Sequence, residues 1–532
     1  MTTITPYRSA TQAGKNGFAQ VLRAEWTKFR TVRGWLIGMV LAAIVMVLLG
    51  VLTGGANSIA CQLGPGGQVK HGRACLPPPP PTAPGGQPVS DAFYFVHRPL
   101  PGNGSLTARV TSFTGRYAAG QGPFPQLTAM GLQPWSKGGI IIKAGLKQGA
   151  QYAAMLVTGS HGVRMQDNFT RDTAGLPGRV SAASPRWLRL TRSGDTITGY
   201  DSADGTHWTR VGTAHLAGLP ATVQVGLFAT SPNHIVINQN FGGGETGATD
   251  PSQATAVLDR VSLAGSASGA WTGTEVGGAL AAPAPGRFQR AGDAFTVTGS
   301  GDIAPVPPGD GNGLGPNTTI ERNLVGAFAA LIAIAVVAAM FITAEYRRGL
   351  IRTTLAASPR RGRVLAAKAI VVAAVTFVVG LAAAIVAVAV GNKLASAKGF
   401  YLYPVTGLTE VRVVAGTAAL LAVAAVFALG AGALLRRSAV AVTAVIVAIV
   451  LPYILAVASV LPAGVADWLL RITPAAGFAI QQSVPVYPQV TGLYTPNGGY
   501  FPYEPWVGFA VLCGYAALAL GLALYRLRRR DA

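Results

Sequence analysis

The chain has 532 residues, of which 50% are hydrophobic and only 12% are charged, with a formal net charge of +22 at pH 7. This composition excludes a disordered chain and favours a membrane protein with room for at least one soluble domain. The basic residues do not gather on one soluble segment with interleaved aromatic residues, which argues against a nucleic-acid partner. Many of them flank apolar runs, where lipid headgroups are the expected partner.

Residues 17–34 are predicted to form an amphipathic helix at the membrane interface. Apolar residues, Trp26 and Phe29 among them, recur at helical spacing on one face, and basic residues lie opposite. Glu25 falls inside this apolar stripe, which a purely lipid-facing helix would avoid. We therefore expect Glu25 to turn toward a protein partner, such as an arginine of the basic connector at residues 344–365. The alternative is a solvated carboxylate at the edge of the stripe.

Six apolar runs are long enough to cross a hydrocarbon core of about 30 Å, which requires roughly 20 helical residues. They are residues 35–53, 324–343, 366–390, 411–435, 439–461 and 506–525. The first run is preceded by too long a segment for a signal peptide and is interpreted as a signal anchor. Few ionisable residues lie in the middle of these runs, which argues against ion channels and proton-coupled carriers.

The basic clusters between the runs predict the orientation of the chain. The connector 344–365, the turn Arg436-Arg437 and the tail 526–532 are basic and all fall on one side of the six runs. Positively charged short loops remain in the cytoplasm. We therefore expect both ends of a multi-pass plasma-membrane protein to be cytoplasmic, with residues 1–16 as a loose tail.

Residues 462–505 form a second segment outside the membrane runs, rich in Pro, Tyr and Gly. Its apolar portion is too short to span a bilayer, so we expect a re-entrant or an interfacial helix there. Small residues in the runs permit close helix packing, or simply reflect a composition rich in Ala and Gly. They include Gly380, Gly416, Gly430, Gly432 and Gly514.

The segment between the first two runs, residues 54–323, differs in character from the rest and is expected to be extracytoplasmic. Residues 54–90 form a linker rich in Pro and Gly. Cys61 and Cys75 bracket a short loop in it; they form a disulfide if the compartment is oxidising, or else remain two unpaired thiols. From residue 91 to 310, short alternating runs are separated by turn residues, which predicts an all-β sandwich of two antiparallel sheets.

The run WLRLTRSGDTITGYDSADGTHWTRVG, with GGIIIKAG before it and VQVGLFATS after it, resembles the concanavalin A-like lectin and glucanase family. The resemblance implies a jelly-roll sandwich over residues 91–263. Family members often place a strand reading GSGDI before DAF, whereas here FTVTGSGDIAP follows the other strands at Phe295–Pro305. Either this stretch returns to complete the sandwich, which would close an exposed edge, or a second repeat begins near Trp271.

No catalytic or metal site is predicted in the sandwich. A glycosidase needs two carboxylates about 5 Å apart, and no such pair is evident. Acidic residues of the sandwich are expected to bind backbone groups in turns; they include Asp195, Asp201 and Asp204. Three tryptophans could stack on a sugar ring or be ordinary core and rim residues, namely Trp135, Trp187 and Trp208. A binding or spacing module is favoured over an enzyme.

Three motifs together resemble the permease subunit of ABC-2 type exporters: RAEWTKFRTVRGW, EYRRGLIRTTLAASPRRGRVLAAK and RITPAAGFAI. The resemblance implies a coupling loop at residues 344–365 that docks on an ATP-binding subunit, and pairing of two permeases into a homodimer or heterodimer. The implied docking residues are Glu345, Arg348, Gly349, Arg352, Thr353 and Thr354. The alternative is a basic loop that only sets the orientation.

We therefore expect a membrane all-α protein of six transmembrane helices with an inserted all-β sandwich. The expected function is that of an export permease without enzymatic activity of its own. The sequence has no G-x-x-x-x-G-K-[ST] phosphate loop, so a partner subunit would hydrolyse ATP and this chain needs no cofactor. Membrane lipids and a cell-wall glycan are further expected partners. The alternative function is a membrane-anchored carbohydrate-binding or cell-wall-sensing protein.

Overall fold

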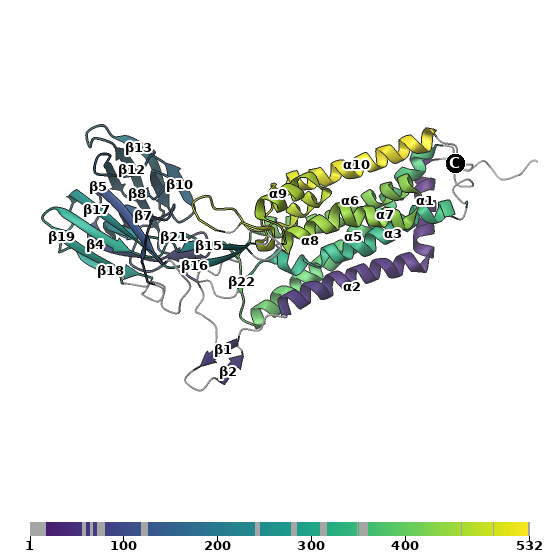
Figure 1. Cartoon of the computed structure of the whole chain (residues 1–532), viewed down its shortest axis with the longest axis horizontal. Coiled ribbons are helices and arrows are strands. Elements are labelled where there is room, and N and C mark those ends of the chain that lie inside the picture. The colour runs from purple at the N-terminus through teal and green to yellow at the C-terminus, as the bar shows by residue number, and fades with distance from the viewer. Residues whose placement is uncertain are drawn as a thin grey trace, which may run out of the picture.

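The protein consists of a helical bundle joined to a β-rich region (Figure 1). The computed structural model describes residues 17–55, 60–63, 68–71, 80–118, 126–239, 245–277, 285–308, 317–347, 349, 360–458, 460–492 and 494–529. The expected disulfide involves Cys75 and the side chain of Cys61, which lie outside this part of the chain.

Six helical segments in the described residues are long and apolar enough to cross a membrane, as the sequence predicts. Five are α2 (Arg33–Gly55), α3 (Ala327–Arg347), α5 (Arg361–Ala397), α6 (Gly407–Leu435) and α10 (Pro505–Arg529). The remaining one is a single span built from α7 (Ser438–Val445), a π-helical turn η4 (Ile446–Val450) and α8 (Leu451–Val457). The helix α5 is longer than its apolar run, because basic residues continue it at its N-terminus.

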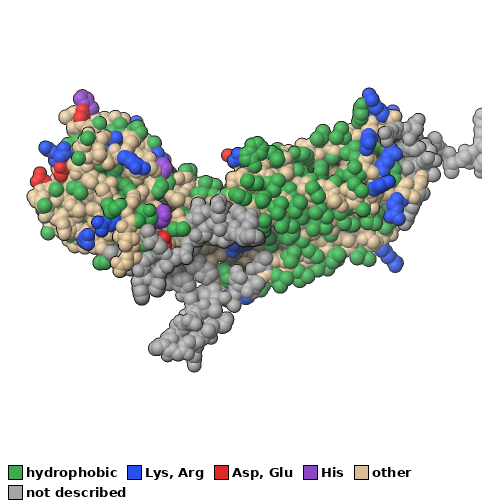
Figure 2. All heavy atoms as spheres, viewed as in Figure 1, with side chains coloured by type: hydrophobic (Ala, Val, Ile, Leu, Met, Phe, Trp, Pro, Cys, Tyr) green, Lys and Arg blue, Asp and Glu red, His purple; other side chains and the backbone are tan. Residues whose placement is uncertain are grey.

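The helix α6 is the centre of the bundle and packs against α3, α5 and α10. In its most apolar stretch 67% of the residues are buried, against 22% in α2 at the periphery. Outward-facing residues of α2, such as Ile37 and Val40, are exposed although apolar. Figure 2 shows a broad apolar surface along the bundle, as expected for helices in contact with lipid chains.

Two short helices enter the bundle at the end nearest the sandwich. The helix α9 (Ala463–Ile472) is followed by η5 (Pro474–Gln481), whose residues are all buried. Tyr515 Oη donates to the carbonyl of Ile472 at 2.7 Å. Tyr515 lies ten residues along α10, roughly 15 Å from its start at 1.5 Å per residue. The chain therefore runs into the bundle with α9 and turns back with η5. The re-entrant or interfacial helix expected in residues 462–505 stays a prediction.

The β-rich region is a sandwich of two antiparallel sheets, as predicted. The seven-stranded sheet has the order β10 (Arg171–Ala174), β9 (Val163–Asp167), β8 (Tyr152–Thr158), β7 (Lys137–Lys143), β14 (Thr222–Thr230), β4 (Phe93–Pro101), β18 (Thr272–Val276). The other has the order β13 (Thr209–His215), β12 (Thr196–Ser202), β11 (Arg186–Ser193), β5 (Gly104–Tyr117), β17 (Ser252–Gly265), β20 (Ala294–Gly299), β19 (Arg287–Ala291), with β6 (Ala129–Met130) beside β5.

Apolar side chains that alternate along the strands fill the space between the sheets. Ile140 and Ile142 of β7 meet Leu188 and Leu190 of β11 in this core. Ile141, on the opposite face of β7, belongs to a second buried cluster that is rich in Phe. Both faces of the seven-stranded sheet are therefore covered, and for this reason β7 and β8 are buried along their whole length.

The stretch Phe295–Pro305 completes the same sandwich and does not begin a second repeat. The strand β20 pairs with β17 and is itself flanked by β19. The strand β21 (Ile303–Pro305) pairs with β3 (Val89–Asp91), which ends on the first residue of DAF. Trp271 is followed by β18, which pairs with β4 at the edge of the other sheet. The strand missing ahead of DAF is thus supplied from the far end of the insert.

Small elements connect the two parts. Two hairpins are formed by β1 (Ala60–Leu63) with β2 (Gln68–His71), and by β15 (His234–Gln239) with β16 (Glu245–Asp250). The short parallel pair β22 (Asn317–Thr318) and β23 (Tyr401–Leu402) and the 3-10 helices η3 (Ile320–Leu324) and η6 (Pro496–Gly498) lie between sandwich and bundle. The helix α1 (Phe18–Thr31) crosses the opposite end of the bundle (Figure 1).

Candidate functional site

The helix α1 is held on the bundle by its apolar face. Phe29 is fully buried, and its ring centroid lies 5.4 Å from that of Phe341 on α3 and 5.8 Å from that of Trp35 on α2. Trp26, expected on the same face, is 45% exposed. This placement suits a helix at an interface, with one aromatic residue in protein and another facing outward.

Beneath α1 lies a buried cluster of charges that joins three helices. Lys368 Nζ on α5 lies 2.7 Å from Glu25 Oε2 on α1 and 2.7 Å from Glu345 Oε1 on α3. Glu25 and Lys368 are 1% and 0% exposed. Glu25 therefore turns toward a protein partner, as expected. The prediction that this partner is an arginine of the connector is wrong. The partner is a lysine just beyond the connector, Lys368, which lies two turns into α5 and faces inward beneath α1.

A second lysine completes the cluster from the outer side. Lys28 Nζ lies 2.8 Å from Glu25 Oε1 and 3.1 Å from Glu345 Oε1. Burial alone would lower the pKa of Lys28, but its hydrogen bonds and proximity to the two carboxylates outweigh this and raise the pKa above 10.5. The two acids are thus balanced by two bases, which offsets the cost of removing the charges from water.

The surroundings of Lys368 are dry. Its ammonium lies 4.4 Å from the centroid of the Phe341 ring, the distance of a cation–π contact. Glu345 Oε2 is buried without a hydrogen-bond partner among the described residues. Buried ionic groups of this kind contribute little net stability but strongly disfavour any arrangement that separates them. The cluster therefore fixes α1, α3 and α5 relative to one another.

The cluster lies at both ends of the predicted coupling loop, since α3 ends at Arg347 and α5 begins at Arg361. Glu345 does not lie on an open docking face as expected, because its side chain is only 10% exposed and turns toward the lysines. Gly349 has φ +67° and open space around its Cα. The other predicted docking residues, Arg348, Arg352, Thr353 and Thr354, lie outside the described part of the chain.

Basic side chains gather at this end of the bundle (Figure 2). Some of them join helix ends: Arg526 Nη1 donates to the carbonyl of Leu434 at 2.8 Å, and Arg361 donates to the carbonyl of Leu527. Arg436 adopts a left-handed conformation at the end of α6, and its guanidinium lies 5.2 Å from the Tyr346 ring centroid. The end of the bundle that carries α1 is therefore strongly positive.

The structure does not gather the three candidate tryptophans into one sugar site. Trp135 is only 6% exposed, and its ring stacks on His161 with centroids 3.9 Å apart. The Arg109 and Arg189 guanidiniums lie over the Trp187 and Trp208 rings at 5.5 Å and 3.8 Å. Those last two rings belong to the eight-stranded sheet, whereas Trp135 lies beside β9 of the other sheet. Packing, which the sequence does not reveal, decides the exposure of each ring.

Of the three acidic residues predicted to bind backbone groups in turns, Asp195 and Asp204 lie in turns, whereas Asp201 lies in the strand β12. Asp204 Oδ1 accepts hydrogen bonds from the backbone N–H groups of Thr206 and His207, both at 2.8 Å. The hydrogen bond from the His207 side chain, together with these N–H groups, lowers the pKa of Asp204. Asp195 accepts from Gly218 N and Asp201 from Leu176 N. No group of three or more potential metal-binding side chains occurs in the part of the chain that the structure describes.

Two buried ion pairs tie the strand β7, which carries the GGIIIKAG motif, to the DAF motif and to the GSGDI motif. Lys143 Nζ lies 2.6 Å from Asp91 Oδ2, and both side chains are fully buried. Lys137, at the other end of β7, lies 2.6 Å from Asp302. Burial lowers the pKa of Lys143 and raises that of Asp91, each opposed by the partner's charge. Sequence reasoning missed these pairs, although all four residues lie in or beside motifs that it singled out.

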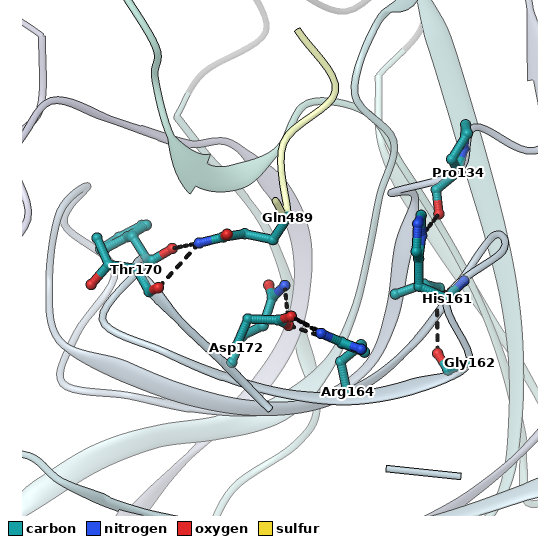
Figure 3. Close-up of polar contacts among 10 residues, drawn as sticks. Pro134, His161, Gly162, Arg164, Thr170, Asp172 and Gln489 are labelled. Atoms are coloured by element: carbon teal, nitrogen blue, oxygen red, sulfur yellow. Dashed lines mark hydrogen bonds and ion pairs between the residues drawn. The ribbon is translucent and has the colours of Figure 1, made fainter. Parts of the chain in front are cut away.

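A loop from the bundle forms direct hydrogen bonds with the sandwich. Gln489 Nε2, in the segment between η5 and α10, donates to the carbonyls of Phe169 and Thr170 at 3.3 Å and 3.1 Å (Figure 3). Phe169 has a positive φ of 70° and a buried side chain. In the same close-up Asp172 pairs with Arg164 on the adjacent strand. The sequence offered no signal for this contact, which joins residues more than 300 positions apart.

A bundle of six spanning helices, crossed by an interfacial helix and carrying an inserted sandwich, defines a multi-pass membrane protein. Residues 164–532, more than half of the chain, match the family described as ABC-2 family transporter protein. The chain therefore belongs to the ABC-2 transporter family. This family is built of transport permeases, and membership implies partnership with an ATP-binding subunit.

No curated protein matches the chain. Among solved structures, scytalido-glutamic peptidase is 8% identical with a TM-score of 0.24, covering 41% of this chain and 100% of that one. A functionally unknown protein from Saccharomyces cerevisiae is 12% identical with a TM-score of 0.21, covering 39% and 96%. These scores support no argument about function, and the concanavalin A-like identity of the sandwich remains a prediction.

Proposed function

We propose that this protein is the transmembrane subunit of an ABC-2 type export system, powered by a separate ATP-binding subunit. Family membership and the six candidate spans support a permease. The observation that carries the coupling part of the proposal is the ion cluster of Glu25, Lys28, Glu345 and Lys368. It fastens the interfacial helix to both helices that flank the predicted docking loop.

In the proposed orientation the α1 end of the bundle is cytoplasmic and the sandwich is extracytoplasmic. The gathering of basic residues at the α1 end supports this orientation, since positive loops remain inside. Both termini and the loop between α3 and α5 would then face the cytoplasm. The ATP-binding subunit would meet the basic loop, and the chain itself would not hydrolyse ATP because its sequence has no phosphate loop.

A movement of the docking loop would be transmitted directly to the helices of the bundle. Glu345 and Lys368 lie close to the two ends of the loop and are bonded to each other. Movement of either therefore shifts α3 and α5 together, and both pack against the central α6. Glu25 and Lys28 pass the same movement to α1. We expect two such permeases, identical or different, to form one pathway that alternates between inward-open and outward-open states.

The sandwich is proposed to act as an external module held on this transport bundle. The hydrogen bonds of Gln489 and the buried contact of Tyr487 and Val490 with Ala304 support a fixed attachment. Binding of a cell-wall glycan remains part of the proposal, since the motif resemblance favours a lectin-like sandwich. Because a guanidinium covers one face of Trp187 and one face of Trp208, we propose that a glycan would bind elsewhere on the sandwich.

The test is purification of the tagged full chain from its native host in mild detergent, followed by an assay for associated ATPase activity. We expect an ATPase to copurify with the natural protein and to be lost from the Arg348→Glu/Arg352→Glu variant. The control carries the same charge change at two exposed arginines of the sandwich, Arg179→Glu/Arg210→Glu, and should retain the ATPase. An intact protein without any associated ATPase contradicts the proposal.

A further inference from the structure

The bundle contains a cavity of about 380 Å³ at its sandwich end. It lies where η3, α8, η5 and η6 meet, far along the bundle from the charge cluster. Its size is within the usual range of small-molecule sites. The lining combines apolar and aromatic groups with a few polar ones, among them Glu321, Tyr453, Gln481, Asn497 and Phe501.

The most unusual member of this lining is the carboxylate of Glu321. The residue is 9% exposed, and its Oε2 accepts a hydrogen bond from the hydroxyl of Ser483. Its Oε1 is buried without a hydrogen-bond partner among the described residues. A buried carboxylate oxygen without a partner is costly, and such a group is retained where it meets a ligand or has another specific role.

The unpartnered oxygen points to the side of the loop that lines the cavity. A Cβ added at Gly499 would collide with Oε1, and Gly499 adopts a φ of +88° that suits only glycine well. The N–H of Gly499 donates to Pro496 instead of to Glu321. The loop thus approaches the carboxylate closely but does not satisfy it.

The basic side chains near Glu321 in the described part of the chain do not reach its carboxylate within ion-pair distance. Arg412 on α6 donates to the carbonyls of Ile480 and Gln482 at 3.1 Å and 2.6 Å. Arg322 lines the same cavity, with an exposed side chain. Neither guanidinium forms an ion pair with Glu321 within the described residues. The carboxylate of Glu321 therefore lies at the buried side of a cavity whose wall is largely apolar, without an ion-pair partner among the described residues.

The aromatic residues of the wall are positioned by a local distortion of the helix. The π-helical turn Ile446–Val450 and Pro452 directly precede Tyr453 and change the phase of its side chain. The ring of Tyr453 stacks on Phe478 with centroids 3.9 Å apart. π-Helical turns are rare and occur frequently at functional sites. Phe501, partly exposed, provides a second ring in the wall.

We propose that this cavity binds the ammonium group of a small organic amine, with Glu321 as its counter-ion and the aromatic wall around its apolar body. A buried carboxylate beside aromatic rings is the arrangement that recognises organic cations. Neither a free amine nor the amine headgroup of a lipid is excluded by this chemistry. The binding goes beyond the proposed transport function and does not require an ATP-binding partner.

The test uses the full chain in nanodiscs made of phosphatidylglycerol, titrated calorimetrically with benzylamine, benzyl alcohol or benzoate. We expect saturable binding of benzylamine and at least roughly tenfold weaker binding of the neutral alcohol and of the anion, because only the amine can form a charge-assisted hydrogen bond. Adding phosphatidylethanolamine to the nanodiscs distinguishes the sources. If phosphatidylethanolamine weakens benzylamine binding, the natural ligand is a lipid headgroup. If benzylamine binding is undiminished, the natural ligand is a free amine.

Two variants and one control complete the test. Glu321→Gln should abolish the preference for benzylamine over benzyl alcohol, and Phe501→Leu should weaken benzylamine binding while the fold, monitored by thermal unfolding, is retained. Glu410→Gln makes the same chemical change at an exposed carboxylate in the first turn of α6 and should leave binding unchanged. Equal binding of benzylamine and benzyl alcohol, unchanged binding by Glu321→Gln, or absence of saturable binding overturns the proposal.

Discussion

Lys368 and Glu25 lie 343 positions apart in the chain, yet their charged groups are 2.7 Å apart and both side chains are buried. The pair joins a helix predicted at the membrane interface to the start of a spanning helix. Since an isolated buried charge is far less stable than a paired one, the two helices cannot separate without a large loss of free energy.

We predict that Lys368→Met destabilises the protein by about 3 kcal/mol or more, because Glu25 and Glu345 then share only the half-exposed Lys28. Thermal unfolding in detergent measures the effect. Lys28→Met is the matched control, and its loss should be no more than about 1 kcal/mol, since the Lys28 side chain is 39% exposed. Equal losses for the two variants would show that the cluster is not organised around Lys368.

Stability should depend on pH through Asp167. Burial raises the pKa of Asp167 to about 6, with Arg171 opposing the shift. The folded protein therefore holds this proton more tightly than the unfolded chain, whose aspartate has a pKa near 3.8. Stability consequently falls as pH rises from about 4 to 6 and stays at the lower level above that.

The variant Asp167→Asn should remove this dependence and stabilise the sandwich above pH 6 by about 1 to 2 kcal/mol. Unfolding followed by intrinsic fluorescence between pH 4 and 8 provides the comparison. Asp293→Asn, in the exposed turn between β19 and β20, should leave the profile unchanged. A profile that keeps its slope in Asp167→Asn would refute the assignment.

We predict that Gln489→Ala loosens the attachment of the sandwich. The loss of two hydrogen bonds, one of them to the carbonyl of the buried Phe169, corresponds to about 1 to 3 kcal/mol. Hydrogen exchange measured by mass spectrometry should then increase in peptides covering residues 168–172. Gln148→Ala, which removes a comparable bond to the Asp91 carbonyl inside the sandwich, should leave these peptides protected. Unchanged exchange in Gln489→Ala would mean that other contacts carry the attachment.

The glycines of the spanning helices differ in how closely neighbouring helices approach them. A Cβ at Gly430 would lie 3.0 Å from the Ala519 backbone on α10, whereas nothing lies within 4 Å of one at Gly514. We expect Gly430→Val to destabilise the bundle by about 2 kcal/mol or more and Gly514→Val to have little effect. Thermal unfolding of both variants tests this. Comparable behaviour of the two would remove the evidence for close contact between α6 and α10.

Labelling from outside intact cells tests the proposed orientation. A cysteine at His207, whose side chain is 92% exposed on the sandwich, should react with a membrane-impermeant maleimide. A cysteine at Arg437, exposed in the turn after α6, should react only after the cells are opened. The increase over the background of the natural cysteines is measured. Labelling of Arg437→Cys in intact cells would contradict the orientation.

The spanning helices could be predicted from sequence because hydropathy is a local property. The inward position of Glu25 was equally accessible, since an acid within an apolar stripe indicates a buried partner. The partner itself was not accessible. Lys368 follows Arg360, Arg361 and Arg363 in the sequence, and nothing local marks it as the base that helix α5 turns inward.

The sandwich shows the same division. Alternating residues predicted its strands. The displaced GSGDI motif left two possibilities, and the structure shows the one in which the far end of the insert returns to the sandwich. Long-range packing was not predictable. The contacts of arginines with Trp187 and Trp208 depend on residues distant in sequence. The same holds for the hydrogen bond from Gln489 to the turn at Phe169. Sequence patterns identify elements, whereas exposure and pairing depend on tertiary contacts.

The pairing of β3 with β21 has a mechanical consequence. Val89 faces Pro305 at the end where the chain enters and leaves the sandwich, and Asp91 faces Ile303 at the other end. Tension applied through the two linkers would pull this antiparallel pair apart from one end, so its hydrogen bonds would break one after another at low force. The slack released would lengthen the tether before α2 and α3 were strained. The pair is therefore positioned to open first when the insert is pulled away from the membrane.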